Sequence, residues 1–191
     1  GNAVAAIIAS GLAGASANDA VKTLNHVHIR GRMEMINSNT HGTIYVDYAH
    51  NYASLKRLLA FLKRQTNAGK VTVVLGATGD KGISRRPGFG KALTEEQPDE
   101  VILTTDDPGF EDPMTIAREI DSYIDHDKVK HIQFEMDRET AIKKAIDGSE
   151  NDDIVVLAGK GEDPYQKVNG EDVPYPTDVK IARDYINELE K

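Results

Sequence analysis

The chain has 191 residues, of which 39% are hydrophobic and 28% are charged. This composition is typical of a folded globular protein and excludes a disordered or fibrous chain. The formal net charge of −8 argues against nucleic-acid binding, which needs clustered Lys and Arg, and the lack of cysteine excludes disulfide bonds and thiolate metal sites.

The first thirty residues are expected to form two short helices. Small apolar residues at helical spacing predict a helix over 2–12, and a second helix is predicted over 18–24 with Asn18 as its N-cap. The apolar opening is too short and too interrupted to span a membrane, so we expect a cytoplasmic protein without membrane insertion. Residues 1–30 have the character of the end of a preceding domain.

From Gly31 onward, short apolar runs alternate with helical patterns. Strands are predicted over 33–36, 43–46, 71–75, 101–104, 131–134 and 154–157. Helices are predicted over 55–62, 87–96, 114–123 and 138–146, and a final helix begins at Asp178 with Thr177 as its N-cap. These repeated units predict a Rossmann-like α/β fold: a mostly parallel sheet with helices on both faces and one antiparallel strand near the N-terminus.

The stretch from Ile154 to Gln166 combines a buried strand with a polar loop. Four consecutive apolar residues are typical of a parallel strand that is covered on both faces. Gly159 and Gly161 follow, and they allow a sharp turn or a close approach to a ligand. Open α/β sheets bind ligands just beyond the carboxyl ends of their strands, which is where Lys160 and Asp163 are expected.

Polar clusters follow three other predicted strands, over 47–50, 76–87 and 104–109. Charged loops at strand ends occur in every α/β protein, but four clusters at one edge of a sheet favour a binding site. Asp106 and Asp107 form a carboxylate pair that could bind an ammonium group, although Asp-Pro-Gly is also ordinary turn chemistry.

The common phosphate and metal motifs are not present in the sequence. The glycines of 76–82 do not have the dinucleotide-binding spacing, and Gly159-Lys160-Gly161 does not form a P-loop. The 76–87 loop could still hold an anion through its backbone amides, assisted by Lys81, Arg85 and Arg86. The six histidines include no pair at metal-binding spacing, so no metal site is expected.

Six motifs together resemble the Mur ligase family. In chain order they are GRME (31–34), VDYAH (46–50), GDKGISRRP (79–87), TDDPGFEDP (105–113), DR (137–138) and AGKGEDPYQ (158–166). Residues 31–191 are similar to the C-terminal domain of the tripeptide synthetases, which add the third residue to the UDP-N-acetylmuramoyl dipeptide of peptidoglycan precursors. Residues 1–30 are similar to the last helices of that family's central, ATP-binding domain.

The resemblance implies an ATP- and Mg²⁺-dependent amide-bond synthesis in a cytoplasmic monomer. In this family the D-glutamyl carboxylate becomes an acyl phosphate, and the α-amine of the incoming amino acid attacks it. The catalytic residues and most contacts to ATP and Mg²⁺ are expected in the central domain. This chain is therefore expected to hold no catalytic or metal-binding residue and to be inactive alone.

The same resemblance implies two sets of site residues. The amino-acid substrate is expected to contact Asp106, Asp107, Asp163, Gly159, Arg85 and Arg86. The nucleotide is expected to contact Arg32, Asp47, His50 and Lys81.

One departure from the family pattern predicts the substrate. Family members that select meso-diaminopimelate carry D-N-P-R, in which Arg faces the distal carboxylate; here the motif reads Asp106-Asp107-Pro108-Gly109. Loss of the Arg and gain of an Asp favour a cationic side-chain end. This predicts L-lysine as the substrate, with ornithine as a close alternative.

Two other functions compete with this interpretation. They are a ligase domain like that of folylpolyglutamate synthetase and a nucleotide-binding module without catalysis.

Overall fold

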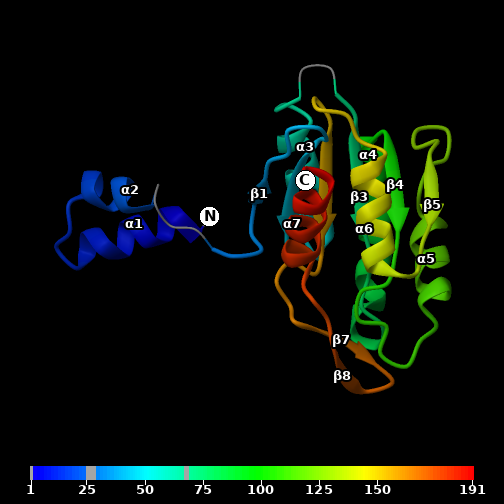
Figure 1. The fold of residues 1–191 in the computed structure, drawn as a ribbon. Coiled ribbons are helices and arrows are strands. Elements are labelled where there is room, and N and C mark those ends of the chain that lie inside the picture. The colour runs from blue at the N-terminus through cyan, green and yellow to red at the C-terminus, as the bar shows by residue number, and fades with distance from the viewer. Residues whose placement is uncertain (1, 25–28, 67–68) are drawn as a thin grey trace.

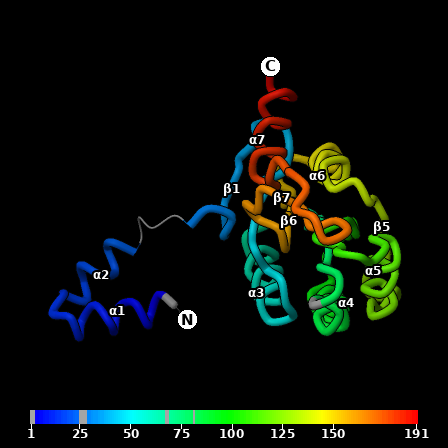
Figure 2. The backbone as a smooth tube through the Cα atoms, turned by 90° about the horizontal axis from the view of Figure 1, so that it is seen from below, coloured from blue at the N-terminus to red at the C-terminus, as the bar shows by residue number. Residues whose placement is uncertain are grey.

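The computed structural model describes residues 2–24, 29–66 and 69–191, apart from the side chains of Asn2 and Lys81. Helices α1 (Asn2–Leu12) and α2 (Ala17–Leu24) pack on each other, and Figures 1 and 2 both show this pair apart from the α/β unit. The predicted N-cap was wrong, because Asn18 lies inside α2. Val4, Ile8 and Leu12 of α1 are between 57% and 87% exposed, so the helix presents an uncovered apolar surface.

The α/β unit is built on one six-stranded sheet with the order β1-β2-β6-β3-β4-β5. Its strands are β1 (Glu34–Ile36), β2 (Thr43–Asp47), β3 (Val71–Leu75), β4 (Glu100–Leu103), β5 (Ile132–Phe134) and β6 (Ile154–Ala158). Strand β1 pairs with β2 in antiparallel fashion, and all other pairs are parallel. The predicted fold class is confirmed.

Helices cover both faces of this sheet, as Figure 2 shows. One face carries α3 (Tyr52–Leu62), α4 (Arg86–Glu96) and α5 (Pro113–Asp121), and the other carries α6 (Arg138–Asp147) and α7 (Asp178–Leu189). Every residue of β3 and β6 is buried, which explains why β6 is an unbroken apolar run and why β3 is apolar apart from Thr72. The Thr177 side chain caps α7 by accepting a bond from the Lys180 N–H at 3.2 Å, as predicted.

Two elements after strand ends were not predicted. A 3₁₀ helix, η1 (Asp80–Arg85), precedes α4, and a hairpin of β7 (Tyr165–Val168) and β8 (Glu171–Pro174) follows β6. The hairpin turns at Asn169 and Gly170, whose φ angles are +52° and +81°. Asn-Gly is the commonest sequence signal for such a turn, so this pair could have predicted the hairpin.

Within the described part of the chain, no helix is long and apolar enough to cross a membrane.

Candidate ligand-binding site at the carboxyl edge of the sheet

The loops that leave the parallel strands meet at one edge, which we call the carboxyl edge. It consists of residues 47–51, 76–81, 104–112 and 159–166, and it lies at the lower end of the sheet in Figure 1, beside β7 and β8. Backbone hydrogen bonds join neighbouring loops: the Gly159 N–H donates to the Asp47 carbonyl at 3.0 Å, and the Gly79 N–H donates to the Asp107 carbonyl at 2.7 Å. The loops therefore form one connected surface.

A buried lysine lies beneath the acidic part of this edge. The Lys160 side chain is 0% exposed, and its ammonium donates to Asp107 Oδ1 at 2.6 Å and lies 3.7 Å from Asp106 Oδ1. The rings of Tyr165 and Tyr175 lie 5.6 and 5.9 Å from the same ammonium. Two carboxylates and two aromatic faces thus surround one cation, which compensates for its removal from water.

The Asp106 carboxyl has an unusual environment even with this partner. Burial raises the pKa of Asp106, and the positive charges of Arg138 and Lys160 oppose the rise only in part. The neighbouring negative charge of Asp107 adds to the rise. The carboxyl edge therefore contains an acid that is easier to protonate than an ordinary aspartate.

A second buried ion pair holds the carboxyl edge to the helices behind it. Arg138, at the start of α6, makes a two-pronged contact with Asp178 at the start of α7, with distances of 2.8 and 2.7 Å. Its guanidinium also donates to the Thr105 carbonyl at 3.2 Å and to the Ala158 carbonyl at 3.0 Å. Burial by itself lowers the pKa of Arg138, but the charge and hydrogen bonds of Asp178 raise it overall. One side chain thus joins two helices to the ends of β4 and β6.

The two arginines before α4 have different environments. Arg86 is buried, and its guanidinium contacts Glu119 at 2.5 Å and both oxygens of Glu111 at 2.8 and 2.9 Å. These contacts lower the pKa of Glu111. Arg85 is exposed and makes no ion pair with the described side chains. Arg85 can therefore reach a ligand, whereas Arg86 is already bound by two carboxylates.

Tyr48 joins the loop after β2 to the loop after β6. Its hydroxyl accepts a bond from the Glu162 N–H at 2.9 Å and donates to Asp163 Oδ1 at 3.4 Å. The ring packs on Gly31 and Gly161, because a Cβ on either residue would lie 2.7 Å from ring atoms. Both glycines have positive φ, +66° and +61°, so close packing and backbone conformation both require glycine there.

We expect Gly161→Ala to lower the free energy of unfolding by about 1–3 kcal/mol, because its Cβ would meet the Tyr48 ring and its φ is unfavourable for alanine. The matched control is Gly11→Ala, since nothing lies within 4 Å of a Cβ at Gly11 and helix propensity favours alanine there by up to about 1 kcal/mol. Urea unfolding of both variants checks this. Unchanged stability of the Gly161 variant would show that Tyr48 does not pack as described.

Three of the residues expected at the nucleotide lie around Tyr48. The Arg32 guanidinium carbon lies 5.3 Å from the centre of the Tyr48 ring, and Arg32 is exposed. Asp47 accepts a bond from the Met33 N–H at 2.9 Å through Oδ2. His50 is exposed, with Nδ1 2.7 Å from the Tyr48 carbonyl, so Nδ1 carries the proton and Nε2 is left to face solvent or a ligand.

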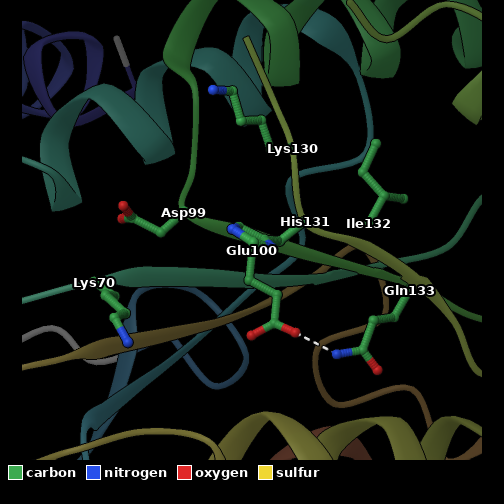
Figure 3. A pocket seen from close by; sticks show the side chains of 7 residues that line it. All are labelled: Lys70, Asp99, Glu100, Lys130, His131, Ile132 and Gln133. Carbon is green, nitrogen blue, oxygen red and sulfur yellow. Dashed lines mark hydrogen bonds between the residues drawn. The ribbon is translucent and has the colours of Figure 1, made fainter. Parts of the chain in front are cut away.

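A separate polar hollow lies at the opposite end of the sheet (Figure 3). It measures about 470 Å³ and is lined by Lys70, Asp99, Glu100, Lys130, His131, Ile132 and Gln133. These residues lie just before β3, β4 and β5 or within the first two residues of a strand, whereas ligands of open α/β sheets bind at the carboxyl ends. Its Glu100 and Gln133 side chains bond to each other at 2.5 Å. We assign no ligand to this hollow.

Residues 31–161 match the sequence profile of the family described as "Mur ligase, glutamate ligase domain". The chain belongs to the Mur ligase family. A curated relative from Limosilactobacillus reuteri (strain DSM 20016), named UDP-N-acetylmuramyl-tripeptide synthetase, is 99% identical over the whole chain, which covers 37% of that relative. One from Enterococcus faecalis (strain ATCC 700802 / V583), named UDP-N-acetylmuramoyl-L-alanyl-D-glutamate–L-lysine ligase, is 47% identical over 98% of this chain and 36% of its own length.

One solved structure supports the same family. A UDP-N-acetylmuramoyl-L-alanyl-D-glutamate–2,6-diaminopimelate ligase is 32% identical, with a TM-score of 0.76 over 98% of this chain and 38% of that one. A folylpolyglutamate synthase from Thermotoga maritima, at 21% identity and a TM-score of 0.54, shares the fold alone. The resemblance to the Mur ligase C-terminal domain is confirmed, and the chain spans about 37% of the length of the first curated relatives that it matches.

The structure brings most of the predicted site residues of this Mur ligase domain to the carboxyl edge. Asp106, Asp107, Gly159 and Asp163 follow β4 and β6, Arg85 lies in η1, and Arg32, Asp47 and His50 lie around β2. The side chain of Lys81 lies outside the described residues, so its contacts stay a prediction. Which of these residues touch a ligand also stays a prediction.

Sequence reasoning did not assign a role to several residues that shape this edge. The sequence places Tyr48 within a motif without giving it a separate role, and it predicts Lys160 as a polar residue of the loop rather than as a buried cation. The available signal for the buried cation was a lysine between two glycines directly after an apolar strand, together with two aspartates at the end of another strand. Its burial depends on the β7–β8 hairpin, which supplies Tyr165.

Proposed function

We propose that this chain is the C-terminal part of an ATP-dependent ligase that adds L-lysine to UDP-N-acetylmuramoyl-L-alanyl-D-glutamate in peptidoglycan precursor synthesis. Membership of the Mur ligase family supports the proposed reaction class, which is amide-bond formation with release of ADP and phosphate. The relative that is named as an L-lysine ligase supports the substrate. We propose in addition that the enzyme is a cytoplasmic monomer.

The carboxyl edge supports binding of a cationic amino acid. The Asp107 side chain is 19% exposed and pairs with Lys160 at 2.6 Å, so a substrate amine can share its carboxylate. Asp163 is half-buried, and among the described side chains its carboxylate bonds only to the Tyr48 hydroxyl. It can therefore accept a hydrogen bond from the substrate α-amino group. Gly159 allows close approach, with φ at +103°.

The proposed contact to the substrate α-carboxylate is made by an arginine. Arg85 is the better placed of the two candidates because its side chain is exposed. Arg86 would act indirectly, since its bonds to Glu111 and Glu119 fix the start of α4. A guanidinium suits this role because it binds carboxylates with two parallel hydrogen bonds.

The region around β2 fits a contact with ATP. The exposed Arg32 guanidinium can bind the phosphate oxygens of a nucleotide. Asp47 can accept hydrogen bonds from the nucleotide, and His50 can donate or accept them. A hollow of about 350 Å³ beside Asp47 is lined by Met33, Ser54, Arg57, Leu58 and Phe61. Lys81 is proposed as a further nucleotide contact. ATP supplies the phosphoryl group that activates the glutamate carboxylate, and the residues of this chain bind and orient the nucleotide.

Within the described part of the chain, no three His, Asp or Glu side chains gather closely enough to hold a metal ion by themselves. The proposed assignment places Mg²⁺, the catalytic residues and most ATP contacts in a central domain, of which residues 1–30 would be the last helices. The exposed apolar side chains of α1 support this, because such a surface is normally covered by protein.

The proposal is tested with the full-length ligase, UDP-N-acetylmuramoyl-L-alanyl-D-glutamate, ATP, Mg²⁺ and L-lysine. We expect a product heavier than the dipeptide substrate by one lysine residue, with one ADP released per product. Reactions without lysine or without ATP are the controls. ADP release that does not depend on an amino acid, with no new product, would contradict the proposed function.

A further inference from the structure

Gly109 leaves a space that another side chain fills. Its φ is +62°, and a Cβ at this position would lie 2.4 Å from Asp80 Oδ2 and 3.3 Å from Asp80 Cγ. The β7–β8 hairpin holds Gly109 in place, because the Gly109 N–H donates to the Lys167 carbonyl at 2.9 Å and the Gly109 carbonyl accepts from the Asn169 N–H at 2.7 Å. The Asp80 carboxylate therefore lies directly over the backbone of Gly109.

The backbone around Asp80 is held so that its carboxylate faces outward. Asp80 has a φ of +48°, and its N–H donates to Glu111 Oε1 at 2.6 Å. The Asp80 side chain is exposed, and among the described side chains its carboxylate makes no ion pair and accepts no hydrogen bond. A residue with positive φ is uncommon unless its surroundings fix it, and Glu111 is in turn held by Arg86.

The neighbouring carboxylates are less available than that of Asp80. Asp107 is bound by Lys160 and by the Lys167 N–H, and Asp106 is only 6% exposed. Asp163 contacts the Tyr48 hydroxyl on the other side of β6. Of the acids after β3 and β4, Asp80 is the one with an exposed, uncommitted carboxylate beside position 109.

We propose that Asp80 is a specificity-determining residue that binds the side-chain ammonium of L-lysine; this inference rests on the proposed function. A glycine at position 109 leaves room for the carboxylate, and an ionised carboxylate binds a cation through charge-assisted hydrogen bonds. An arginine at position 109 would fill the same space and reverse the local charge. Asp80 and Gly109 therefore act as a pair that selects a cationic substrate end.

The test compares Asp80→Asn with wild type in the full-length ligase. Asparagine has nearly the same shape and tolerates positive φ, so the variant is expected to fold. We expect the KM for L-lysine to rise at least about tenfold, equivalent to about 1.4 kcal/mol, with the KM values for ATP and the UDP-dipeptide within twofold of wild type. Asp184→Asn is the matched control, because Asp184 is exposed and, among the described side chains, pairs only with Lys180 on α7.

A second variant, Gly109→Ala, tests the pairing. Its Cβ would displace the Asp80 carboxylate, so we expect a rise in the lysine KM that is not additive with that of Asp80→Asn. An unchanged lysine KM for Asp80→Asn, or an equal rise in all three KM values, would overturn the inference. If the wild-type ligase forms no product with lysine, the proposed function fails; if it does and Asp80→Asn behaves as wild type, only this inference fails.

Discussion

Replacing Arg138 by methionine is expected to lower the free energy of unfolding by about 3–5 kcal/mol, the usual cost of removing one partner of a buried ion pair. Asp178 is 0% exposed. Without Arg138, the Tyr175 hydroxyl, at 2.7 Å, would be the one hydrogen-bond donor left to its carboxylate among the side chains that the structure describes. The Thr105 and Ala158 carbonyls would lose their donors as well. Urea unfolding measures the difference.

Arg183→Met is the matched control for this change. Arg183 pairs with Glu34 at 2.7 Å, but its side chain is 54% exposed, so its loss should cost about 1 kcal/mol or less. If the Arg138 and Arg183 variants were equally stable, the buried pair would not hold the carboxyl edge to α6 and α7.

Replacing Asp107 by arginine should reduce kcat/KM for L-lysine at least about 100-fold in the full-length ligase, equivalent to about 2.7 kcal/mol. The new guanidinium would meet the buried Lys160 ammonium, and Lys160 would lose its 2.6 Å partner. The Lys167 N–H, which bonds to Asp107 Oδ1 at 3.1 Å, would also be left without its acceptor. Steady-state kinetics with varied lysine checks this.

Asp107→Asn separates the loss of charge from the loss of shape. Its amide oxygen can still accept from Lys160 and from the Lys167 N–H, so we expect a smaller loss than for arginine. Lysine kinetics equal to wild type in the arginine variant would remove Asp107 from the site.

The sheet could be predicted from the sequence because its central strands, β3 and β6, are apolar apart from Thr72. Ile154–Leu157 and Val71–Leu75 are covered on both faces. Short runs of β-branched residues without regular alternation, bounded by turn residues, indicate this environment. Once parallel strands are expected, their loops must share one edge, so the meeting of the Asp47, Asp107 and Asp163 loops followed from topology.

The chemistry within that edge could not be predicted in the same way. Lys160 and Arg86 are expected from the sequence in polar loops that meet a ligand, yet both are buried and pair with acidic side chains far away in the sequence. The contact between Asp80 and Gly109 depends on the β7–β8 hairpin, which positions Gly109. Such details depend on side-chain packing between loops, and sequence spacing carries little information about it.

Competition between two amino acids tests the central claim most directly. The full-length ligase is given equal concentrations of L-lysine and meso-diaminopimelate with the UDP-dipeptide and ATP, and the products are separated by mass. A carboxyl edge with Gly109 and an outward-facing Asp80 carboxylate predicts that the lysine product predominates. Predominance of the diaminopimelate product would contradict the account, because that edge would then prefer a distal carboxylate over a lone ammonium group.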